Sequence, residues 1–268
     1  MAFDQITGER RERIIVFLHG ILGRGNNLRT IAKRFIEAQP GWTAWLVDLR
    51  GHGRSPKGTP RPSLAAAAGD VVDLAARAAL PVSAIAGHSF GGKVALEAAT
   101  NSGMASLEHV VVIDSMPGRR EPFRMGDSAL AVIETIESLP RTFPSRSDFR
   151  DELIARGMTP SLAQWLGQSV EKEDDHVRYM LSLDEIRALI LDYFAMDLWP
   201  VVERPPGAAR VHLVIGDRSD SYSPADRERA RQIAVSNERV TVDVLPAGHW
   251  VHVDDPDGLL QTLLNRVA

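Results

Sequence analysis

Short apolar runs alternate along the chain with longer stretches of helical periodicity. The run RIIVFLHG (13–20) lacks polar alternation, which is typical of a strand buried on both faces of a sheet. The segment NNLRTIAKRFIEAQ (26–39) instead places apolar residues at helical spacing and ends before Pro40. The same reading predicts strands at 13–20, 42–53 (including a glycine-rich turn), 82–86, 109–114, 209–216 and 239–245, and helices at 26–39, 63–80, 91–101, 224–234 and 257–267.

This alternation stops after Asp114 and resumes near residue 209. Residues 117–206, here called the insertion, contain no clear strand, and their clearest helical pattern spans residues 184–199. The acidic run EKEDDH (171–176) reads as a solvated face or turn. We therefore predict an α/β fold with a mostly parallel central sheet covered by helices. Residues 1–116 and 207–268 would form its core, and residues 117–206 an inserted helical lid.

Composition and charge narrow the range of partners. The 268 residues are 44% hydrophobic and 25% charged, as in ordinary soluble domains, and the net charge of -4 gives no basic surface for nucleic acid. Cysteine is absent, which excludes disulfides and thiolate chemistry and fits a reducing cytoplasm. The apolar run IIVFLHGIL (14–22) is too short to span a bilayer. We expect a cytoplasmic protein without nucleic-acid or membrane partners, and the oligomeric state stays open.

Residues Gly87-His88-Ser89-Phe90-Gly91 match the pattern G-x-S-x-G between a predicted strand and a predicted helix. In such a turn the serine takes a strained backbone conformation, and the chain passes so closely on both sides that the flanking positions require glycine. The turn would hold the Ser89 hydroxyl clear of the sheet. An ordinary Ser/Gly turn is the alternative, and the remaining catalytic parts argue against it.

A serine nucleophile needs a base and donors for an oxyanion. The loop LPAGHWVHVDDP, after the last predicted strand, supplies His249 as the base. The backbone N–H groups of Phe90, next to the nucleophile, and of Ile21, in the loop after the first long strand, are the expected oxyanion donors.

Two patterns resemble cofactor-binding motifs, one for a metal ion and one for a dinucleotide, but neither has the residues or spacing that the motif requires. His249 and His252 form H-x-x-H, but no third ligand cluster accompanies them, so we predict no metal. The glycines of Gly20-x-x-Gly23-x-Gly25 have the wrong spacing for a dinucleotide fingerprint. No organic cofactor is implied by any motif.

The segments LHG, DLRGHGRS, GHSFGGK and AGHWVH follow one another in the order found in the α/β-hydrolase superfamily, which the chain resembles over nearly its whole length. Within it, GHSFGGK, VVVIDSMP and AGHWVHVDDP are similar to the esterase group that includes YbfF and the abhydrolase-domain-11 proteins. The resemblance implies a serine esterase. It suggests substrate contacts at His19, Gly20, His88 and Trp250, whereas His52 would be a structural residue of the turn at 51–53.

The acid partner of His249 has two candidates. In most of the superfamily the acid follows the strand after the insertion, where Asp220 lies 29 residues before His249. In the YbfF-like group it ends the strand before the insertion, and Asp114 matches that position. Both lie near the carboxyl end of a predicted strand, where α/β sites assemble. The resemblance favours Asp114, with Asp220 as the alternative.

These parts predict a serine hydrolase that acts through an acyl-enzyme on esters, or thioesters, of small to medium acyl groups. The apolar face of the insertion would line the acyl pocket. The candidates, for each of which a place in the apolar core is the favoured alternative, are Met125, Leu130, Ile133, Trp165, Phe194 and Trp199. The alternatives are a lyase or C–C bond hydrolase with the same triad, and a ligand-sensing protein that turns over slowly.

Overall fold

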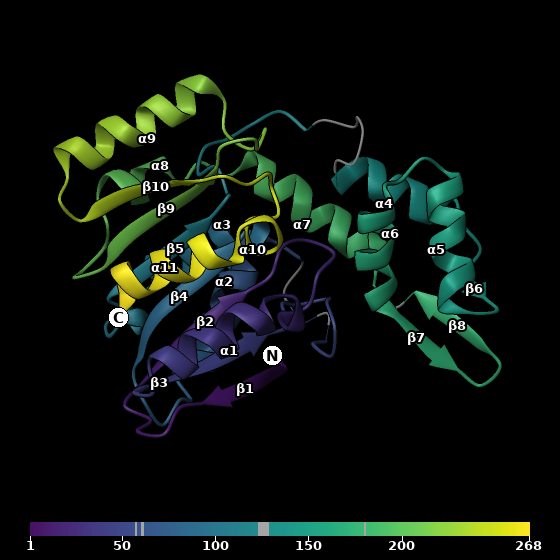
Figure 1. The fold of residues 1–268 in the computed structure, drawn as a ribbon, viewed down its shortest axis with the longest axis horizontal. Coiled ribbons are helices and arrows are strands. Elements are labelled where there is room, and N and C mark those ends of the chain that lie inside the picture. The colour runs from purple at the N-terminus through teal and green to yellow at the C-terminus, as the bar shows by residue number, and fades with distance from the viewer. Residues whose placement is uncertain (57, 60–61, 123–128, 180) are drawn as a thin grey trace.

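A seven-stranded sheet with strand order β1-β3-β2-β4-β5-β9-β10 forms the centre of the protein (Figure 1). The computed structural model describes residues 1–56, 58–59, 62–122, 129–179 and 181–268. Its strands are β1 (Phe3–Thr7), β2 (Arg13–Leu18), β3 (Trp42–Val47), β4 (Val82–His88), β5 (His109–Ile113), β9 (Arg210–Gly216) and β10 (Val240–Leu245). All neighbours run parallel except β1, which pairs antiparallel with β3. The predicted mostly parallel sheet is confirmed, and β1 is an additional edge strand.

Helices cover both faces of this sheet. Side chains alternate between the faces along β2, so that Ile15 and Phe17 join one apolar layer and Val16 and Leu18 join the other. The first layer contains α1 (Arg29–Ala38), α10 (Val251–Asp254) and α11 (Pro256–Val267). The second contains α2 (Leu64–Ala75), α3 (Phe90–Ala99), α8 (Trp199–Glu203) and α9 (Pro224–Ser236). Two short 3-10 helices, Gly25–Leu28 and Ser102–Met104, complete the core.

Most of the chain between β5 and β9, though not α8, extends away from the sheet as a lobe, to the right in Figure 1. It contains α4 (Ala129–Glu137), α5 (Arg146–Ala155), α6 (Pro160–Leu166), a 3-10 helix (Gly167–Ser169) and α7 (Leu183–Ala195). It also holds an antiparallel sheet of order β6-β8-β7, made by β6 (Thr142–Phe143), β7 (Val170–Glu173) and β8 (His176–Tyr179). The prediction of a purely helical insertion is therefore corrected.

Length and polarity explain why these strands escaped the sequence pattern. β6 has two residues, and β7 and β8 read VEKE and HVRY, so each has few apolar positions from which to detect a period of two. The predicted turn at 171–176 is narrower in the structure: residues 171–173 belong to β7, His176 begins β8, and Asp174, with a φ of 47°, and Asp175 connect them. None of the helices in the described ranges combines the length and the apolar character needed to cross a membrane.

Candidate active site

Ser89 occupies a strained turn between β4 and α3. Its φ of 51° and ψ of −117° are sparsely populated for a residue with a side chain. Its backbone N–H donates to Ile113 O at 2.9 Å, and its carbonyl accepts from Gly92 N at 2.9 Å. A Cβ on Gly91 would lie 2.5 Å from Leu18 O, and one on Gly87 would collide with the Gly91 carbonyl. The two glycines are required by this close backbone approach.

We expect Gly87→Ala to destabilise the fold by about 1–3 kcal/mol, because the added methyl must displace backbone rather than a flexible side chain. Gly69→Ala is the matched control, since Gly69 lies in α2 and no atom comes within 4 Å of the place that its methyl group would take. That control should stabilise the protein by about 0.5–1 kcal/mol. Denaturant unfolding of both variants measures the difference. Equal stability of the two would contradict the tight-turn account.

His249 lies in the loop between β10 and α10, and its side chain meets Asp114. The distance from His249 Nδ1 to Asp114 Oδ2 is 2.7 Å. Asp114 directly follows β5, has a φ of 44° and is fully buried. Its Oδ1 accepts from Gly216 N at 3.0 Å, and its Oδ2 accepts from Ser219 Oγ at 2.5 Å. The carboxylate is thus fixed by donors from β9 and the loop that follows it.

Of the two candidate acids, the structure brings Asp114 to the histidine. Asp220 is exposed and lines the rim of a neighbouring cavity. The residues on either side of it in sequence face the site instead: Ser219 bonds Asp114, and Ser221 Oγ lies 2.9 Å from His249 Nδ1. Sequence reasoning missed these two serines. Their alternate spacing in the segment DRSDSYS, which follows the glycine that ends β9, was the available signal.

His88 supports the backbone of His249. Its Nε2 donates to His249 O at 2.8 Å, and its ring centroid lies 4.8 Å from that of His249. Burial is the main reason that the pKa of His88 is held well below its ordinary value, so the ring is neutral. His88, expected to contact substrate, thus bonds the backbone of His249. Trp250, the other expected contact in this loop, is half-buried, with its ring 5.6 Å from that of His88.

His19, expected to contact substrate, has both of its ring nitrogens hydrogen-bonded within the protein. It is 1% exposed; Nδ1 donates to Gly20 O at 2.7 Å, and Nε2 accepts from Leu49 N at 3.0 Å. Burial lowers its pKa to about 4, so the neutral ring can donate with one nitrogen and accept with the other. Both nitrogens are used within the protein, and none remains for a substrate.

The loop after β2 touches the nucleophile turn. A Cβ on Gly20 would lie 3.1 Å from His88 Nδ1 and 3.4 Å from Ser89 Cβ. Leu22 has a φ of 67°, and its N–H donates to Nε2 of the buried His52 at 3.1 Å. Gly23 N donates to Gly20 O at 3.0 Å. This loop carries Ile21, and the other expected oxyanion donor, Phe90 N, is the first N–H of α3, to which the helix offers no acceptor.

His52 has the structural role that the sequence suggested. It is completely buried, and its Nδ1 donates to Arg50 O at 2.9 Å. Burial, followed by the neighbouring His19, lowers the pKa of His52 to about 3. A neutral ring can accept from Leu22 N, so His52 helps to shape the loop that carries Ile21.

The insertion contacts two loops of the core. Ser169 Oγ donates to Leu22 O, in the loop after β2, at 3.4 Å. Trp165 of α6 packs edge-on against Trp250, in the loop after β10, with ring centroids 4.8 Å apart. Of the other predicted pocket residues, four are buried in the apolar core and Met125 lies outside the described residues; the four are Leu130, Ile133, Phe194 and Trp199. Among these candidates, Trp165 contacts the loop that carries His249, through the ring of Trp250.

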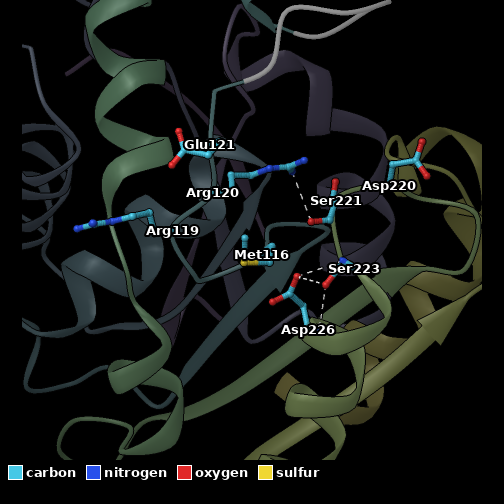
Figure 2. Close-up of a pocket in the computed structure, with 8 residues that line it drawn as sticks. All are labelled: Met116, Arg119, Arg120, Glu121, Asp220, Ser221, Ser223 and Asp226. Carbon is cyan, nitrogen blue, oxygen red and sulfur yellow. Dashed lines mark hydrogen bonds between the residues drawn. The ribbon is translucent and has the colours of Figure 1, made fainter.

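A cavity of about 380 Å³ opens between the start of the insertion and the loop after β9 (Figure 2). It is lined by Met116, Arg119, Arg120, Glu121, Asp220, Ser221, Ser223 and Asp226. In Figure 2, Arg120 points toward Ser221, while Arg119 points away, and its Nε donates to Ala195 O. The lining includes Ser221 but neither Ser89 nor Phe90, so the cavity lies beside the Asp114–His249 pair.

His252 and His249 do not form part of a recognisable metal site. The ring of His252 lies 4.9 Å from that of His88, and burial lowers the pKa of His252 to about 4. Within the described part of the chain, no group of three or more His, Cys, Asp or Glu side chains is arranged to hold a metal ion.

This sheet carries a serine at a strained turn after β4, and the residue before that serine, His88, contacts a histidine that pairs with a buried carboxylate. This is the arrangement of an α/β-hydrolase. Residues 15–262 match the alpha/beta hydrolase family, and the chain belongs to that family. The predicted family and fold class are thereby confirmed.

Relatives that match nearly the whole chain include esterases and lipases. The chain is 27% identical to the mouse (Mus musculus) sn-1-specific diacylglycerol lipase ABHD11, over 100% of this chain and 85% of that protein. It is 26% identical to esterase YbfF of Escherichia coli (strain K12), over 93% of this chain and 91% of that protein. The solved structure of a marine microorganism esterase superposes with a TM-score of 0.81 at 25% identity, covering 99% of this chain and 98% of the other. These matches confirm an enzyme family of esterase type.

Proposed function

We propose that the protein is a serine esterase in which Ser89, His249 and Asp114 form the catalytic triad. The observation that carries this proposal is the 2.7 Å contact between His249 Nδ1 and the buried Asp114 carboxylate. His249 also contacts His88, the residue before the strained Ser89, whose φ is 51°. A carboxylate at Nδ1 selects the tautomer whose Nε2 carries a lone pair. That nitrogen can then accept the proton of Ser89.

The reaction follows from these roles. Ser89 Oγ attacks the acyl carbon while His249 Nε2 takes the hydroxyl proton, and the carbonyl oxygen becomes an oxyanion. The N–H groups of Phe90 and Ile21 would stabilise that charge, each contributing about 3 kcal/mol. The C–O bond to the alcohol breaks as His249 returns the proton to it. Water then attacks the acyl-enzyme by the same route and releases the acid.

The acid-side support is unusual in its composition. The buried Asp114 carboxylate accepts from Gly216 N, Ser219 Oγ and His249 Nδ1, so hydrogen-bond donors stabilise it, and the imidazolium that forms during catalysis would be its cationic partner. Ser219 and Ser221 come from the loop that supplies the acid in much of the superfamily. In this protein that loop would contribute hydroxyl groups in place of a carboxylate.

The proposed substrates are carboxylic esters of small to medium acyl groups, with thioesters open to the same attack. The names of the relatives, an esterase and a diacylglycerol lipase, support ester chemistry. The contact between Trp165 of the insertion and Trp250 supports a lid over the acyl side of the site.

The test is release of p-nitrophenol from acetate, butyrate and octanoate esters by the purified full chain. We expect a burst of about one equivalent per enzyme where deacylation is slow, followed by sustained turnover. A burst without turnover would favour a slow ligand sensor. Absence of release from all three esters would contradict the esterase proposal and favour a lyase or C–C bond hydrolase.

A further inference from the structure

Lys93 is a completely buried lysine one turn after the nucleophile. Its Nζ donates to three backbone carbonyls: Gly118 O at 2.7 Å, Tyr193 O at 2.7 Å and Met196 O at 2.8 Å. The same ammonium lies 4.5 Å from the centre of the Tyr193 ring. An ammonium has three N–H donors, and all three are used here.

These carbonyls belong to the two ends of the insertion. Gly118 lies just after the chain leaves β5, while Tyr193 and Met196 lie in the last turn and at the C-terminal cap of α7. The two ends also bond each other directly, through Arg120 N to Phe194 O at 3.0 Å and Leu198 N to Pro117 O at 2.9 Å. Lys93 is therefore the point at which this junction is tied to α3, the helix that begins immediately after Ser89.

Burial makes this position costly for a charge. Desolvation lowers the pKa of Lys93 to about 7; Asp197 and Asp192 raise it, and Arg120 lowers it further. Burial, followed by the charge of Asp192, raises the pKa of the Glu97 carboxyl, one turn farther along α3. The three carbonyls that accept from Nζ enclose it, so Nζ reaches solvent only when they move. We therefore expect the junction and the Lys93 side chain to open together.

Resting on the proposed esterase function, we propose that Lys93 is a positioning residue that fixes both ends of the insertion to the nucleophile helix and so holds the lid over the acyl side of the site. It does not touch substrate. Its effect is transmitted through α7, whose Tyr193 ring also packs near Phe90, with centroids 6.1 Å apart. Loss of the anchor should loosen the lid while leaving the Asp114–His249 pair in place.

The first test is hydrogen exchange in Lys93→Met, a substitution of similar length without the three donors. We expect the junction amides of Arg120, Met196 and Leu198 to exchange about tenfold faster or more, because three buried carbonyls lose their partner. Lys33→Met, on the exposed face of α1, is the matched control and should leave them unchanged. Unchanged junction exchange in Lys93→Met would overturn the proposal. This measurement is independent of whether the protein hydrolyses esters.

Comparing kcat/KM on a long and a short acyl ester shows whether Lys93 acts on the lid or only supports helix α3. For Lys93→Met we expect kcat/KM on p-nitrophenyl octanoate to fall about tenfold, mainly through KM, and that on the acetate ester to fall less than about threefold. An equal loss on both esters, or no loss on the octanoate, would overturn the proposal. If wild type hydrolyses neither ester, the esterase function fails, and the exchange measurements still decide the role of Lys93.

Discussion

Replacing Ser89 by alanine is expected to lower ester hydrolysis by about five to six orders of magnitude, the size of loss seen when a triad nucleophile is removed. The reason is that the Ser89 hydroxyl is the one held by a strained turn next to the first N–H groups of α3. Alanine removes one oxygen, and the φ of 51° at this position is a cost that the wild-type turn already carries. The measurement is kcat/KM on p-nitrophenyl acetate with circular dichroism as the folding check.

A fluorophosphonate probe provides the matched experiment, since it labels an activated serine covalently. Wild type should gain one adduct, mapped by mass spectrometry to Ser89, and Ser89→Ala should gain none. An adduct at another serine, or retained hydrolysis in the alanine variant, would show that the strained turn is not the reactive centre.

Replacing Asp114 by asparagine is expected to reduce kcat by about 10⁴-fold, because an amide facing Nδ1 favours the wrong tautomer of His249 and cannot balance an imidazolium. Asparagine suits the φ of 44° better than most residues, so the fold should survive. The measurement is kcat on the acetate ester.

Asp220→Asn is the control for this loss, since Asp220 is exposed and lies on the rim of the neighbouring cavity. We expect a change of less than about threefold in this variant. The reverse pattern, a large loss in Asp220→Asn and a small one in Asp114→Asn, would assign the acid to the loop after β9 and require that loop to rearrange.

The core sheet could be predicted because its strands are buried on both faces and must be apolar throughout. The edge strand β1 has the sequence FDQIT, in which polar residues interrupt the apolar pattern, and it is stabilised by pairing with β3 along Phe3–Thr7. The insertion's small sheet has the same difficulty. Such strands depend on partners far away in the sequence, and a local pattern does not contain them.

The serine and the histidine of the candidate site could be located from motif and chain order, whereas the acid could not be chosen from the residues alone. Asp114 and Asp220 both lie near the carboxyl end of a strand, and the two strands, β5 and β9, are neighbours in the sheet. Position along the chain therefore does not show which of the two carboxylates reaches His249. The histidines show the same limit. His19, His52 and His88 all belong to motifs around the candidate site. In the structure each is buried, and each forms a hydrogen bond with the backbone of a nearby loop.

The position of Asp114 at the end of β5 has an evolutionary consequence. The proposed nucleophile and the proposed acid directly follow two adjacent strands, β4 and β5, and the chain enters the insertion only after both. Exchange of that lobe between relatives could therefore change which acyl groups are accepted without rebuilding the reactive centre. With Asp114 as the proposed acid, the loop after β9 needs to keep only its hydroxyl donors, so its outer residues can diversify. Substrate range and chemistry can in this way evolve as separate modules of one chain.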